Sequence, residues 1–112
     1  DDLKITGGTY DITAAGHALS GKDSVRIADG TFILTAEKDG IHAENADDEE
    51  KGYIYIADGD FTITSDGDGM DASNIVQIED GTLDITAGGG VANSLKDGRK
   101  AGRRKYATGY HN

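Results

Sequence analysis

The 112-residue sequence contains no cysteine and no proline, and only 36% of its residues are hydrophobic. Without cysteine no disulfide can hold the fold together, and cysteine usage says nothing about the redox compartment. No hydrophobic run approaches the ~20 residues that a transmembrane helix needs, so we expect no insertion into a membrane. An ordinary mixed fold would have a thin core at this composition, whereas a solenoid tolerates it because each repeat packs on its neighbours.

Basic residues are also scarce, and they are unevenly distributed. Residues 1–95 hold 20 acidic and 5 basic residues, a net charge of −15, whereas residues 96–112 hold 1 acidic and 6 basic residues, a net charge of +5. The acidic body argues against nucleic acid as a partner, because phosphate contacts need lysine and arginine. The same acidity suits divalent cations and a calcium-rich extracellular or cell-surface setting.

A repeat of about 22 residues is the main feature that the sequence does contain. A nine-residue pattern begins at Ile5, Ile27, Ile56 and Ile78, at intervals of 22, 29 and 22 residues. Hydrophobic residues alternate within each copy, which is the periodicity of a strand. Repeats of this length bury their apolar face by stacking on neighbours. The sequence therefore predicts an all-β fold, a right-handed parallel β-helix of about four rungs over residues 1–95.

Each predicted rung has three short strands, and its inward residues stack in columns about 4.8 Å apart. Two such columns consist of Ile5, Ile27, Ile56 and Ile78 and of Tyr10, Phe32, Phe61 and Leu83. Seven extra residues at 46–52 are mostly polar and predict a loop at one corner. Aspartate–glycine pairs between strands also suit the hairpins of an antiparallel sandwich, but near-identical residues every 22 positions favour stacking.

The two ends of the chain carry separate expectations. Residues 1–5 already match the repeat, so we expect this domain to belong to a longer solenoid. Residues 96–112 match nothing in the repeat and predict a mobile basic tail. Open edges on so short a β-helix leave either a monomer or end-to-end association as the expected state.

An acidic corner is predicted where the turns after the second strands of coils two and three align. The acidic residues that this alignment brings together are Glu37, Asp39, Glu44, Asp66, Asp68 and Asp71. Like charges so close repel one another unless a cation lies among them. Carboxylate oxygens beside glycines suit Ca²⁺, so the sequence predicts a calcium site here. The alternative is a solvated acidic turn, in which aspartate and glycine serve only the turn geometry.

Two outward faces are candidates for binding a periodic ligand. Thr35 and Thr64 belong to a column of outward threonines that could match a polysaccharide or ice, although exposed threonine also suits any strand. On the first strands, Tyr55 shares an outward column with Arg26 and Gln77. Its ring could stack on a sugar while Arg26 and Gln77 bond hydroxyls or a carboxylate. The alternative is that Tyr55 only packs against its neighbours.

Little in the sequence points to catalysis. Lys38, beside the acidic corner, could be the base of a calcium-dependent polysaccharide lyase. A solvated lysine that screens the acidic residues is the simpler interpretation. No serine–histidine–aspartate motif, phosphate loop or zinc spacing is present, and His17, His42 and His111 are scattered along the chain.

The repeated motif Ile-x-Asp-Gly-Thr-Phe-x-Ile-Thr, followed by Asp-Gly-Ile-His-Ala or Asp-Gly-Met-Asp-Ala, resembles a family of extracellular bacterial carbohydrate-binding proteins. Members have a polysaccharide-lyase-like right-handed parallel β-helix. The resemblance covers about residues 3–95. It implies calcium bound at acidic turns, where Asp39, Asp68 and Asp71 fall, and affinity for cellulose or acidic plant polysaccharide.

The residues and the resemblance together predict a non-catalytic, calcium-stabilised module that binds plant cell-wall polysaccharide, either cellulose or an acidic pectin-type polymer. A calcium-dependent polysaccharide lyase is the first alternative. An ice-binding or structural adhesin repeat that uses the outward threonine face is the second.

Overall fold

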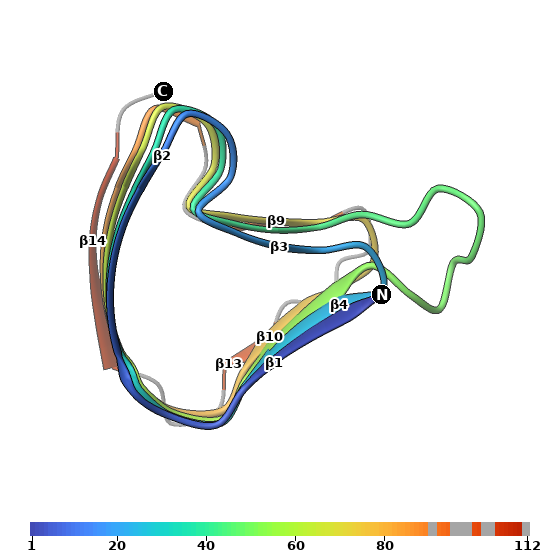
Figure 1. Cartoon of the computed structure of the whole chain (residues 1–112), viewed down its shortest axis with the longest axis horizontal. Helices are drawn as coiled ribbons and strands as arrows, with labels where there is room; N and C mark the ends of the chain where they lie inside the picture. Colours follow the sequence, from blue (N-terminus) through green and yellow to red (C-terminus); the bar gives the residue numbers. More distant parts are fainter. Residues whose placement is uncertain (90–91, 95–99, 102–104, 111–112) are drawn as a thin grey trace.

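The chain folds as a parallel β-helix in which successive strands of each rung lie in three different sheets (Figure 1). The computed structural model describes residues 1–89, 92–94, 100–101 and 105–110. Strands that are one repeat apart in the sequence lie side by side, and the three sheets enclose one core. This architecture confirms the predicted fold class. Within the described ranges, no helix is long and apolar enough to cross a membrane.

Every neighbouring pair of strands is parallel. Sheet A contains, in spatial order, β1 (Asp2–Ile5), β4 (Ser24–Ile27), β7 (Tyr53–Ile56), β10 (Val76–Ile78) and β13 (Lys100–Ala101). Sheet B contains the longest strands, β2 (Thr9–Ala14), β5 (Thr31–Ala36), β8 (Asp60–Ser65), β11 (Thr82–Ala87) and β14 (Lys105–Tyr110). Sheet C contains β3 (Leu19–Gly21), β6 (Ile41–Ala43), β9 (Met70–Ala72) and β12 (Ala92–Ser94).

The register of the sheets follows the sequence repeat. On sheet A, Lys4, Arg26, Tyr55 and Gln77 are successive partners, at intervals of 22, 29 and 22 residues. The longer interval contains the predicted loop, which lies between β6 and β7. Figure 1 shows this loop, in green, projecting from the corner between sheets C and A. We call residues 44–52 the insertion loop.

The coil continues beyond residue 95, where the sequence predicted a tail outside the repeats. Gln77 pairs with Lys100 on sheet A, and Ile85 pairs with Thr108 on sheet B, each pair 23 residues apart. The pairing of β13 and β14 corrects the expected tail for these residues. The repeat pattern was lost because a threonine replaces the apolar partner and the interval is one residue longer. Residues 95–99 and 102–104 lie outside the described part of the chain.

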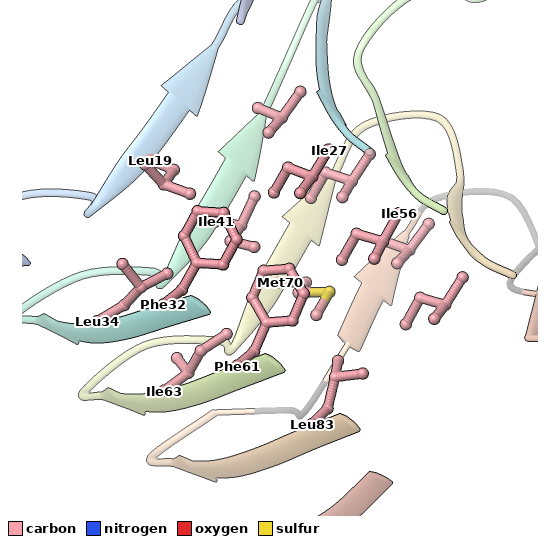
Figure 2. Close-up of a cluster of buried hydrophobic side chains, with 14 of the residues drawn as sticks. Leu19, Ile27, Phe32, Leu34, Ile41, Ile56, Phe61, Ile63, Met70 and Leu83 are labelled. Carbon is pink, nitrogen blue, oxygen red and sulfur yellow. The ribbon is translucent and has the colours of Figure 1, made fainter. Parts of the chain in front are cut away.

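Columns of inward side chains form the core. Figure 2 shows Phe32 and Phe61 from adjacent rungs lying one above the other, surrounded by aliphatic side chains. Their ring centroids are 4.6 Å apart and their planes differ by 5°. Tyr10 extends the column, with its ring centroid 5.0 Å from that of Phe32. Both phenylalanines are buried, so the predicted aromatic column is confirmed and follows directly from the rung spacing.

Aspartate–glycine turns join sheet A to sheet B in three successive rungs. In the second rung, an oxygen of Asp29 accepts a hydrogen bond from the Gly30 amide at 2.8 Å, and Asp58–Gly59 and Asp80–Gly81 repeat this contact. Gly30 has a φ of 136°, in the region that favours glycine. A Cβ atom there would lie 2.8 Å from the ring of Phe32. The turn therefore needs glycine both for its backbone angle and for the packing of the aromatic column.

We expect Gly30→Ala to lower the free energy of unfolding by about 1 to 3 kcal/mol, because the substitution adds backbone strain and displaces the Phe32 ring. Urea unfolding followed by circular dichroism measures this loss. Gly7→Ala is the matched control, since a Cβ atom at Gly7 meets nothing within 4 Å. Equal stability of the two variants would contradict this account of the turn.

Candidate functional site

The turns that lead from sheet B to sheet C form a corner in which polar side chains stack from rung to rung. The Nδ1 atom of His17 accepts a hydrogen bond from the Asp39 amide at 3.2 Å. An oxygen of Asp39 in turn accepts one from the Asp68 amide at 2.7 Å. These residues are 22 and 29 residues apart, which are the intervals of the repeat. Each side chain thus fixes the backbone of the next rung.

Three carboxylates converge at this corner. Asp39, Asp68 and Asp71 each offer an oxygen, and these oxygens lie within 4.8 Å of one another. All three residues are half-buried. Because Ca²⁺ binds oxygen at about 2.3–2.6 Å, ligands on opposite sides of the ion are about 5 Å apart. The separation and the chemistry of this donor set therefore fit a calcium ion, and we call the three residues the acidic corner.

His42 lies among these carboxylates. Its Nδ1 atom is 3.0 Å from an oxygen of Asp39 and 3.4 Å from an oxygen of Asp71, with which it pairs in register. Its Nε2 atom is 3.3 Å from an oxygen of Glu44. Both ring nitrogens donate hydrogen bonds only in the imidazolium form. The surroundings of His42 therefore suit a positive charge that offsets part of the negative charge of the corner.

His17 stacks on His42 with ring centroids 3.8 Å apart and planes that differ by 2°. Burial is the main cause of a lowered pKa of His17. The neighbouring His42 lowers this pKa further, whereas the carboxylate of Asp39 opposes the shift. A neutral His17 is also what its role as an acceptor for the Asp39 amide requires.

A second group of possible metal ligands consists of His17, Asp39 and His42, whose ligand atoms also lie within 4.8 Å of one another. An imidazole binds a metal ion along the nitrogen lone pair, which lies in the plane of the ring. Two parallel rings 3.8 Å apart have no point in common to both planes. The two histidines would have to unstack to share an ion, so the acidic corner is the better metal candidate.

Three of the six predicted metal ligands thus converge, and the other three lie elsewhere. Glu37 and Asp66 are exposed on the turns and belong to neither group of converging ligand atoms among the described residues. Glu44 is exposed and contacts His42. Sequence reasoning missed His17, although its interval of 22 residues from Asp39 is the repeat interval and could have revealed it.

Arg26, Tyr55 and Gln77 lie together on the outward face of sheet A, as predicted. They are register partners on adjacent rungs. Tyr55 is partly exposed and separates two shallow grooves of about 220 and 210 Å³, both of which are also lined by Arg26. Lys4 lines the first groove and Gln77 the second. An amphipathic ring is thus set between cationic and amide groups, which suits contact with a sugar.

Thr35 and Thr64 are paired in register on sheet B, and both are exposed. They belong to the outward column that also contains Thr13 and Thr86. Ile33, on the same face, is 45% exposed and interrupts the hydroxyl array. Because Tyr55 belongs to sheet A, the two groups of predicted carbohydrate contacts lie on different faces of the coil.

Comparison with known proteins identifies the family. A family model described as carbohydrate-binding domain-containing protein matches residues 1–110. The chain belongs to this carbohydrate-binding domain family. The match confirms the resemblance seen in the repeat, and it extends through β13 and β14.

One solved structure is similar to this carbohydrate-binding domain over nearly its whole length. It is a polysaccharide lyase-like protein from C. thermocellum, in a gadolinium derivative, with 32% sequence identity and a TM-score of 0.83. The match covers 98% of this chain and 43% of that chain, so the domain spans less than half of the similar protein. No curated protein matches the chain.

The lowered pKa of His17 predicts a loss of stability in acid. The unfolded chain has the ordinary histidine pKa of about 6.5, so folding favours neutral His17. This contribution is fully present above about pH 6.5 and is lost as the pH falls through the lower folded-state pKa. The free energy of unfolding should therefore decline more steeply between about pH 7.5 and about pH 5 in the wild type than in His17→Gln.

Urea unfolding at several pH values tests this difference. Ser20→Ala is the control, because it changes an exposed residue of the same rung that does not titrate. This variant should keep the slope of the wild type. Parallel profiles for the wild type and His17→Gln would contradict the assigned role of His17.

Proposed function

We propose that this domain binds plant cell-wall polysaccharide on the outward face of sheet A, outside the cell, and that it does not cleave its ligand. The observation that carries the proposal is the register column of Arg26, Tyr55 and Gln77 beside the two shallow grooves. Membership of the carbohydrate-binding domain family supports the same ligand class.

The chemistry of this face suits a polymer of sugar residues. The ring of Tyr55 offers an apolar surface to the C–H face of a sugar, while its hydroxyl group remains available to water or ligand. Arg26 can bond a pair of hydroxyl groups or a uronate carboxylate through its planar donors. Lys4, which lines the groove next to Arg26, adds a second cation. The face is therefore suited to acidic pectin-type chains and also to cellulose.

Calcium is proposed to stabilise the fold rather than to take part in chemistry. Asp39, Asp68 and Asp71 would hold the ion, which would supply positive charge among stacked carboxylates. His42 already supplies polar contacts to two of these residues. The ion would link neighbouring rungs through side chains that stand in register.

The alternative activity, a calcium-dependent polysaccharide lyase, is favoured by the similarity to a protein described as polysaccharide lyase-like. Its predicted base, Lys38, is exposed on a turn. Proton abstraction needs a base held within hydrogen-bond reach of the substrate. Release of unsaturated uronate products, abolished in Lys38→Ala, would establish the alternative and overturn the non-catalytic proposal.

Replacement of Tyr55 by alanine should weaken polysaccharide binding at least tenfold, because aromatic residues at the centre of a binding surface contribute about 2 kcal/mol or more. Isothermal titration calorimetry with cello-oligosaccharides and with oligogalacturonates measures the affinity. The double variant Thr35→Ala/Thr64→Ala, on sheet B, should bind within about twofold of the wild type. The reverse result would move the ligand to the threonine face.

Calcium in excess should raise the melting temperature by about 10 °C relative to EDTA, because ligand at 100 times its Kd stabilises by about 2.7 kcal/mol. Magnesium at the same concentration should have little effect, since it demands a smaller octahedral site. Differential scanning calorimetry makes the comparison.

The double variant Asp68→Asn/Asp71→Asn should lose the calcium effect. The matched control is Glu37→Gln/Asp66→Asn, which removes the two exposed acidic residues that lie outside the acidic corner and should keep it. An equal response of both double variants, or none in the wild type, would rule out the proposed site.

A further inference from the structure

A third groove lies on the outward face of sheet C, on a different side of the coil from Tyr55. Its volume is about 460 Å³, against about 220 and 210 Å³ for the grooves of sheet A. This size falls within the range of about 300–1,000 Å³ that is typical of small-molecule sites. The polar side chains that line it are His17, Ser20, Lys22, His42, Glu44 and Asp47.

The groove is formed where the insertion loop leaves the coil. Ser20 and His42 are register partners on β3 and β6 and contribute outward side chains of sheet C. His17 stacks on His42, so the two rings form one continuous side. Ala46 and Asp47 of the insertion loop form the opposite side. The seven additional residues of this rung therefore give sheet C a side wall.

The insertion loop is held in place by hydrogen bonds to the coil. The Asn45 side chain donates to an oxygen of Asp23 at 2.8 Å, and its oxygen accepts from the amides of Asp47 and Asp48 at 3.0 Å. The Asn45 amide donates to the Ser73 hydroxyl at 3.0 Å, and the Gly52 amide donates to the Asp23 carbonyl at 2.7 Å. Because both ends of the loop are fixed, a ligand would meet a wall already in position.

The charges of the groove select the class of ligand. Lys22 supplies one cation, whereas Glu44 and Asp47 supply two carboxylates, and the carboxylates of Asp39 and Asp71 lie behind His42. An anionic sugar would meet more negative than positive charge. The hydroxyl groups of a neutral sugar both donate and accept, so they match a lining of hydroxyl, ammonium, imidazole and carboxylate groups.

We infer that the groove between the His17–His42 stack and the insertion loop is a second carbohydrate site, specific for a neutral saccharide. The inference rests on the proposed carbohydrate-binding function and adds to it a face with a different charge preference from the cationic face of sheet A. A polymer or two neighbouring chains could then contact the domain on two sides.

Titration of ¹⁵N-labelled protein with a neutral cello-oligosaccharide tests the site. We expect the amide signals of Ser20, His42 and Asp47 to shift, in the wild type and also in Tyr55→Ala. Oligogalacturonate at the same concentration should leave these three signals in place. Loss of the groove shifts in Tyr55→Ala would mean that they report binding at sheet A, and it would overturn the inference.

Variants of the insertion loop provide the matched comparison. Glu44→Ala removes a lining carboxylate and should weaken binding of the neutral oligosaccharide at the groove about tenfold. Glu50→Ala removes an exposed carboxylate of the same loop that does not line the groove, and it should leave the affinity unchanged. Ala46→Trp, which fills the groove from an exposed loop position, should abolish the shifts without lowering the melting temperature. Equal affinities for Glu44→Ala, Glu50→Ala and the wild type would overturn the inference.

The outcomes separate this inference from the proposed function. Shifts confined to sheet A would refute the second site and leave the proposed function in place. Shifts at the groove with oligogalacturonate but not with the neutral sugar would refute the assigned ligand class. No shift with either ligand would refute both the second site and the proposed function.

Discussion

Each residue of this domain is constrained by the residue one repeat before it, because parallel strands in register place equivalent side chains about 4.8 Å apart. The spacing is close to the thickness at which aromatic rings stack, and the column of Tyr10, Phe32 and Phe61 occupies it with ring separations of 5.0 and 4.6 Å. The same spacing brings Gly30 against the Phe32 ring, so the turns and the core are not independent. A residue is suitable here only if it fits both its own turn and the rung beside it.

The constraint acts on the surface as strongly as in the core. Stacking places threonine on threonine along sheet B, which is harmless, but at the acidic corner it places carboxylate near carboxylate. Register therefore creates an electrostatic cost that must be offset locally. His42 meets part of that requirement through its contacts with Asp39 and Asp71. A bound cation at the acidic corner, as proposed, would meet the rest, and stability and ion binding would then share one cause.

The insertion loop is where the chain departs from its own repeat. A regular coil presents flat sheets, and flat sheets offer only shallow grooves such as the two beside Tyr55. The seven extra residues give one sheet a wall, which Asn45 and Asp23 hold in place through side-chain and backbone hydrogen bonds. If the proposed ligands are correct, regular rungs present the extended face for a polymer, and the irregular rung provides the more enclosed and more selective site.

The sequence by itself determined the β-helix, the inward columns and the position of the insertion loop, because alternation within strands and identity between repeats are both visible in one dimension. It also brought out Asp39, Asp68 and Asp71, since their spacing is the repeat spacing. It did not reveal the pairing of β13 and β14, because Thr108 opposite Ile85 lacks the apolar pattern and the interval is 23 residues. Strand pairing depends on backbone hydrogen bonds, which do not require that pattern.

Only the tertiary structure decided which polar side chains of the turns meet. Turn residues have no fixed alternation, so the sequence could not tell that Glu37 and Asp66 remain exposed while Asp39 turns toward His42. It also could not tell that His17 and His42 stack with parallel rings, a geometry that argues against a shared metal ion. The repeat determines which rungs are neighbours, and the path of the chain through each corner determines which atoms come into contact.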